Sequence, residues 1–215
     1  MLQRTLPRLK VKPPQLVDGF SLNLFAAGQF GSSNAATWGG PAFNPSPKVQ
    51  QFANDMNITF PAALRLLAGQ KFNDFPLRFS TCKRHTFSFY HLNYLAVYEH
   101  PLTDKMLHFY AQQKQRPLWC YVQSSSTTDS SNAVVRRSCE RMVKAALFRA
   151  LRAAGYDASG TQLGYAGKGL YGTIRVFIME PKTVLRIDFD RLVEYLTKLV
   201  KGSASQIYRN YPKPK

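Results

Sequence analysis

Residues 136–157 read RRSCERMVKAALFRALRAAGYD, and this stretch predicts a long amphipathic helix. The helical pattern extends over residues 132–154, with Ser130, Ser131 or Asn132 as N-cap and Gly155 as the C-terminal stop. At about 100° per residue, the apolar side chains gather on one broad side that can be buried against a sheet. This predicted core side consists of Val135, Cys139, Met142, Val143, Ala146, Leu147, Ala150 and Leu151.

The opposite side of the same helix carries positive charge. Four cations fall within about 80° of one another. This basic stripe consists of Arg137, Arg141, Lys144 and Arg152. Phe148 lies among them, Arg136 and Arg149 flank them, and Glu140 is the only acid of the helix. Cations three or four positions apart repel each other, and a helix shaped for stability alone usually interleaves glutamates.

Two interpretations of the basic stripe follow. In the first, it is a solvated cationic face without a ligand. In the second, it neutralises phosphates, and Phe148 either stacks on a base or packs under the N-terminal arm. The near absence of acids favours the second.

The segments that flank this helix predict a small sheet. Residues 117–123 and 170–180 are strand candidates, and residues 184–188 follow across the short turn EPKT, as a hairpin partner would. A second amphipathic helix then begins at Asp188 or Asp190, whose carboxylates complement the helix dipole.

Two topologies fit these elements, and both are α+β folds with two helices on one face of a small antiparallel sheet. Counting residues 117–123 as a strand gives the ferredoxin-like order βαββα(β), in which residues 205–211 supply the optional last strand. Replacing that strand by one at residues 162–165 gives αβββα, the order of a double-stranded-RNA-binding domain. That domain begins its last helix with lysines, whereas residues 188–191 are Asp-Phe-Asp-Arg. The ferredoxin-like order is therefore preferred, and αβββα is the second choice.

Residues 160–169, GTQLGYAGKG, predict a glycine-rich turn with Lys168 at its tip. The loop is not GxxxxGK[ST], and it precedes a strand instead of opening a helix. It therefore lacks the helix dipole of a phosphate cradle. We expect a basic β-turn whose Lys168 can touch a phosphate backbone.

The N-terminal part predicts a basic extension followed by an irregular arm. Residues 1–17 contain no acidic residue and resemble a mitochondrial targeting segment. Their prolines limit any helix, so the segment also fits a basic tail that lies extended along a polyanion. Residues 18–60 are rich in Gly, Asn and Pro without a lasting period, yet carry several large aromatic side chains. We expect this arm to pack on its own domain or on a partner.

The rest of the chain divides into three segments. Residues 61–116 predict a mixed helix and strand segment of uncertain autonomy, with one helix over residues 101–115. Residues 117–202 predict an α+β domain of RNA-binding type. Residues 203–215 predict a basic C-terminal tail.

The charge balance narrows the class of partner. Lys and Arg number 29 against 12 Asp and Glu in 215 residues, a formal net charge of +17. Such an excess implies a polyanionic partner, either nucleic acid or an anionic membrane surface. The basic helix has no apolar insertion face separate from its core side, and no run approaches the roughly 20 apolar residues of a membrane span. Nucleic acid is therefore the preferred partner.

The sequence holds no recognisable catalytic or metal-binding pattern. Its four histidines lie outside nucleophile, zincin and phosphotransfer motifs, and its three cysteines form no CxxC pair. Asp188 and Asp190 fit helix capping better than a carboxylate pair. We expect no enzyme activity, no small-molecule substrate, no cofactor and no metal, with reduced thiols suited to a reducing compartment.

These features predict a structural RNA-binding protein that recognises shape and charge, since no sequence-reading motif is found. The predicted RNA-binding residues are Arg136, Arg137, Arg141, Lys144, Phe148, Arg149, Arg152 and Lys168. In composition and layout the chain resembles mitochondrial ribosomal proteins. That resemblance implies ribosomal RNA and neighbouring ribonucleoprotein subunits as partners. It implies the mitochondrial matrix as location, with cytosol or nucleus as the alternative.

Three alternatives stay open. A mitochondrial RNA-processing or ribosome-assembly factor would share every feature described. A peripheral inner-membrane factor would use the same charge on anionic lipid. A protein–protein assembly factor would use the aromatic arm and leave the charge incidental.

Overall fold

A computed structural model describes residues 43–98, 100–124, 130–165 and 168–210. Its centre is a four-stranded sheet with the strand order β2-β3-β7-β5. The strands are β2 (Arg65–Leu66), β3 (Leu77–Cys82), β7 (Gly172–Ile178) and β5 (Leu118–Ser124). β3 is antiparallel to both β2 and β7, whereas β5 is parallel to β7.

Helix α3 (Ala133–Ala153) connects the parallel strands and begins where the sequence predicts. The Asn132 side chain caps it by accepting a hydrogen bond from the Val135 amide at 2.9 Å, and Gly155 follows its end with φ +91°. Six of the eight residues predicted on its core side are buried, and Val135 and Met142 are half-buried. The 3.6-residue period thus places α3 correctly against the sheet.

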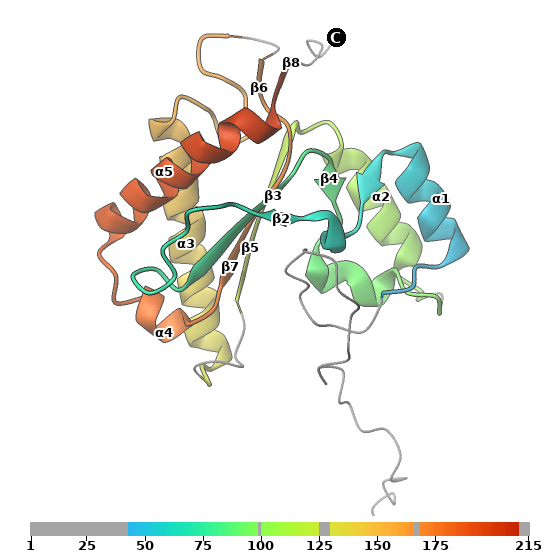
Figure 1. Ribbon diagram of the computed structural model, residues 1–215. Coiled ribbons are helices and arrows are strands. Elements are labelled where there is room, and N and C mark those ends of the chain that lie inside the picture. Colours follow the sequence, from blue (N-terminus) through green and yellow to red (C-terminus); the bar gives the residue numbers. More distant parts are fainter. Residues whose placement is uncertain (1–42, 99, 125–129, 166–167, 211–215) are drawn as a thin grey trace, which may run out of the picture.

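Helices α3 and α5 (Phe189–Ile207) cover one face of the sheet (Figure 1). Phe79, Val176 and Val122 lie side by side on three neighbouring strands and point to this face. Asp188 caps α5 by accepting from the amides of Asp190 and Arg191 at 3.0 and 3.1 Å. The α+β class and the placement of two helices on one face are therefore confirmed.

A second core lies on the other side of the sheet (Figure 1). Its elements are α1 (Pro47–Asp55), β1 (Ile58–Thr59), η1 (Pro61–Ala63), β4 (His85–Thr86), η2 (Phe89–Tyr94) and α2 (Thr103–Gln113). Strand β5 contributes to both cores, because Leu118 points to the α3 side and Trp119 to the second core. Residues 43–116 are thus joined to the main sheet through β3 and β5.

The antiparallel sheet and the ferredoxin-like order are not confirmed. β5 and β7 are parallel neighbours, and residues 184–188 are not a hairpin strand. Pro181 opens the short helix α4 (Pro181–Val184), and the amides of Val184 and Leu185 donate to the carbonyls of Glu180 and Pro181. A proline is favourable in the first turn of a helix, and the helical conformation buries Val184. The segment EPKT, predicted as a hairpin turn, is therefore helical.

The second-choice order αβββα also differs from the structure. Residues 162–165 form no strand, and Gln162 makes only an isolated bridge to Tyr156. A separate two-stranded ribbon forms later in the chain, where β6 (Lys168–Leu170) pairs antiparallel with β8 (Tyr208–Asn210).

Two expected irregular segments are more ordered than predicted. Helix α1 lies within the arm predicted over residues 18–60, of which residues 18–42 lie outside the described residues. Ser46 caps the helix, and Val49, Phe52 and Ala53 have helical spacing. Flanking Pro and Asn residues hide this spacing in the sequence. Helix α5 continues through Gly202 to Ile207, and the turn beyond the glycine buries Ser203 and Ile207. The segment predicted as tail from residue 203 therefore starts inside a helix.

Candidate nucleic-acid interface

The basic stripe lies on the exposed side of α3. Arg137, Arg141, Lys144 and Arg152 are all exposed, and the opposite side of the helix is buried in the main core. No residue of the stripe forms an ion pair with a described residue. The helix backbone holds these cations in a row at the spacing of successive turns. This side of α3 is therefore an exposed row of four cations that form no ion pair with a described residue.

Glu140, the only acid of α3, does not neutralise the stripe through an ion pair. Its Oε1 accepts hydrogen bonds from the Ser124 amide at 3.0 Å, the Ser124 hydroxyl at 2.7 Å and the Tyr90 hydroxyl at 3.1 Å. The carboxylate thus joins α3 to the end of β5 and to η2. Its role in the fold explains why an acid is present on an otherwise cationic surface.

Two of the predicted RNA-binding residues take part in contacts within the protein. Arg136 is half-buried and donates from Nη1 to the Ser131 carbonyl at 2.9 Å. Arg149 pairs with Asp190 at 3.2 Å, and its guanidinium lies 5.7 Å from the centre of the Phe189 ring. Arg149 therefore lies at the contact between α3 and α5, beside the stripe and not within it.

Phe148 lies between the stripe and the core. Its ring is half-buried and packs against the main core, and the Lys144 ammonium lies 5.9 Å from the ring centre. A cation at that distance gains a small attraction and is held near the helix surface. The structure thus places Phe148 as a support for Lys144 and leaves only part of its ring accessible.

Lys168 comes from a different element. It is exposed at the start of β6, opposite Asn210 of β8, so the glycine-rich segment enters a ribbon. Gly169 and Gly172 have φ values of +156° and +113°, which suits glycine at the sharp bend between β6 and β7.

Tyr90, which no sequence pattern marks as functional, lies next to Glu140 at the flank of the stripe. The residue is 52% exposed, and its hydroxyl contacts Glu140. The density of Phe and Tyr around residues 87–94 was the available signal, but their position next to α3 depends on tertiary structure.

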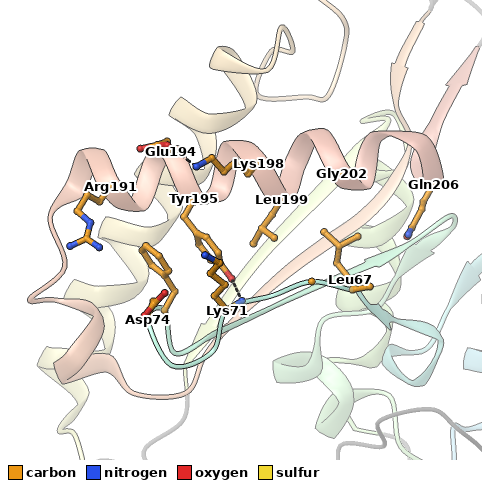
Figure 2. Close-up of a pocket in the computed structure, with 13 residues that line it drawn as sticks. Leu67, Lys71, Asp74, Arg191, Glu194, Tyr195, Lys198, Leu199, Gly202 and Gln206 are labelled. Atoms are coloured by element: carbon orange, nitrogen blue, oxygen red, sulfur yellow. Dashed lines mark hydrogen bonds and ion pairs between the residues drawn. The ribbon is translucent and has the colours of Figure 1, made fainter.

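A separate groove of about 600 Å³ lies between α5 and residues 67–75 (Figure 2). Phe75 and Tyr195 stack in its wall with ring centres 4.0 Å apart, and the Lys71 amide donates to the Tyr195 hydroxyl at 3.2 Å. Its charges largely compensate, because Lys198 pairs with Glu194 at 2.7 Å. The remaining charged residues of the lining are Lys71, Asp74 and Arg191. The groove is therefore a poorer match for a polyanion than the stripe.

No cluster of three or more His, Cys, Asp or Glu with the geometry of a metal site occurs within the described residues. None of the helices in the described parts of the chain is long and apolar enough to cross a bilayer. Cys120 is half-buried against the main core, and burial raises the pKa of its thiol to about 12 despite the nearby Lys144 charge. The thiol is therefore a poor nucleophile at neutral pH.

Comparison with known proteins identifies no relative: no family model, curated protein or solved structure matches the chain.

Proposed function

We propose that this protein binds structured RNA through the basic stripe and acts as a structural component of a ribonucleoprotein particle, the mitochondrial ribosome. One observation carries the proposal: four uncompensated cations share the exposed side of a helix whose other side is in the core. Like charges at this spacing cost stability, so a polyanion that neutralises them gains both affinity and relief of repulsion.

The proposed mode of binding is electrostatic. The stripe places Arg137, Arg141 and Lys144 on consecutive turns, where they can contact successive phosphates of one strand. Such contacts fix position and provide affinity with little sequence preference. Lys168 and the basic residues of 1–17, which lie outside the described residues, would extend the contact.

The mitochondrial part of the proposal rests on the composition of residues 1–17 and on the resemblance in layout to mitochondrial ribosomal proteins. A ribosome-assembly factor would use the same surface. Sucrose-gradient sedimentation of the tagged protein from fractionated cells, with and without ribonuclease, separates the two, because a structural subunit sediments with mature particles and an assembly factor with precursors.

The direct test is charge reversal of the stripe. The triple variant Arg137→Glu, Arg141→Glu, Lys144→Glu should lose RNA binding while its circular dichroism stays native, because these side chains make no ion pair with a described residue. The matched control reverses three exposed cations elsewhere, Lys83, Lys105 and Lys201. Both variants lower the net charge of +17 by the same amount. Equal RNA binding by the two variants would contradict the proposal.

A further inference from the structure

Tyr90 is held at a fixed position next to the basic stripe. Its hydroxyl donates to Glu140 Oε1 at 3.1 Å and lies 3.4 Å from the Ser124 amide nitrogen and carbonyl oxygen. Burial and the Glu140 charge raise the pKa of Tyr90, so the hydroxyl stays protonated and keeps donating. The polar end of the side chain is therefore anchored, while the residue as a whole stays 52% exposed.

The anchor places Tyr90 next to the N-terminal part of α3. Glu140 lies three positions after Arg137 and four before Lys144, and residues at these spacings are neighbours on a helix surface. Arg136, which flanks the stripe, is close enough for its charge to act on the Tyr90 hydroxyl, so Tyr90 lies at the flank of the stripe. Phe89, which precedes it in η2, is also 43% exposed.

A fixed, exposed aromatic ring beside a row of cations suits unpaired nucleotides. The cations contact the phosphates, and the ring offers a face on which a base can stack without regard to its identity. In a duplex the bases are stacked on one another and cannot reach a side chain at the protein surface. Phe148 is a weaker platform, because it is half-buried under Lys144.

We propose that Tyr90 is a base-stacking platform and that the RNA bound by the stripe is unpaired where it passes η2. This proposal rests on the proposed function of the stripe and specifies the kind of RNA that it binds. The partner is then a loop, bulge or single-stranded segment of structured RNA instead of a continuous duplex.

The test compares oligouridine with an RNA duplex of matched phosphate number. Tyr90→Leu should weaken binding of the single strand roughly tenfold or more, the contribution of one stacked base, and leave duplex binding within about twofold. Tyr90→Phe keeps the ring but loses the hydroxyl that anchors it, so its affinity for the single strand should lie between those of the wild type and Tyr90→Leu. Phe72→Leu is the matched control, because Phe72 is another exposed aromatic residue, 37% exposed, on the loop next to α5.

A second readout reports stacking itself. 2-Aminopurine placed in the oligonucleotide should be quenched by the wild type and by Tyr90→Phe, and not by Tyr90→Leu at saturating protein. Circular dichroism and thermal unfolding of each variant show that the fold is kept.

The outcomes separate the two proposals. If Tyr90→Leu weakens both RNAs equally or neither, while the stripe triple variant loses both, the stacking proposal is overturned and the stripe function stands. If the stripe triple variant binds both RNAs like the wild type, both proposals fail.

Discussion

At the scale of single residues, Arg141 shows the conflict between stability and charge in the stripe. It lies four positions after Arg137 and three before Lys144, so it repels two neighbours. Arg141→Glu replaces both repulsions by attractions. It should raise the free energy of unfolding by about 0.5–1 kcal/mol and weaken RNA binding.

Denaturant unfolding and RNA affinity of the same variant check this prediction. A gain in stability together with a loss of binding would identify Arg141 as a residue kept for its partner. A loss of stability would show that its positive charge serves the fold.

His85 is a second informative residue, because it is fully buried in an aromatic cluster. Its ring stacks on Trp119 with centres 4.3 Å apart, and its Nδ1–H donates to the Gly172 carbonyl at 3.2 Å. Burial, and secondly the charge of Lys114, lower the pKa of His85 to about 4, while the bond to Gly172 opposes the shift. The ring is therefore neutral at physiological pH.

The lowered pKa predicts a stability change on the acid side. An unfolded histidine titrates near pH 6.5, so below that pH the unfolded chain binds a proton that the folded protein excludes. As the pH falls from about 6.5 to about 4, His85 should lower the free energy of unfolding by about 3 kcal/mol. Above about pH 7, His85 should have no effect on the pH dependence of that free energy. Urea unfolding of wild type and His85→Phe across pH measures this contribution as their difference. Parallel pH profiles would contradict it.

At the scale of elements, Gly172 joins the ribbon to the main sheet. Its φ is +113°, and a Cβ there would collide with the Cys82 carbonyl oxygen of the neighbouring strand. Gly172→Ala should therefore destabilise the protein by about 2–4 kcal/mol. Gly164→Ala is the control, because Gly164 also has a positive φ, +84°, but open space around it, and should cost only about 1 kcal/mol. Thermal unfolding of both variants checks the difference, and equal costs would exclude the collision as the cause.

The elements that sequence predicted best are those with a long period and a clear cap. α3 and α5 have both, with Asn132 and Asp188 as observed caps. Short segments were predicted less well, because tertiary contacts decide them. α4 begins at Pro181 and buries Val184, and the part of α5 beyond Gly202 buries Ser203 and Ile207.

In the candidate site too, local sequence patterns could be predicted and tertiary contacts could not. The exposed stripe could be predicted, since one helix carries all four cations. The separate roles of Arg149 and Tyr90 could not, because their partners, Asp190 and Glu140, lie far from them in sequence.

In the whole molecule, the helix that carries the stripe belongs to a fold with two hydrophobic cores, one on each face of the same sheet. Trp119 and Leu118, adjacent in β5, point to opposite cores, so α3 is supported by the main core and η2 by the second. The contact of Tyr90 with Glu140 then joins the two sides across the edge strand β5. The proposed RNA surface therefore lies over both halves of the protein.

The most direct measurement of the central claim is the salt dependence of RNA binding by the full chain. The logarithm of the association constant should fall linearly with the logarithm of salt concentration. If the four cations of the stripe contact phosphates, they contribute about −3 to −4 to this slope, and Lys168 and residues 1–17 add to it. The triple variant of Arg137, Arg141 and Lys144 should reduce the magnitude of that slope by about 2–3, and the control triple variant of Lys83, Lys105 and Lys201 should leave it unchanged. A flat salt response of the wild type, or equal slopes for the two variants, would contradict the claim that the stripe binds RNA.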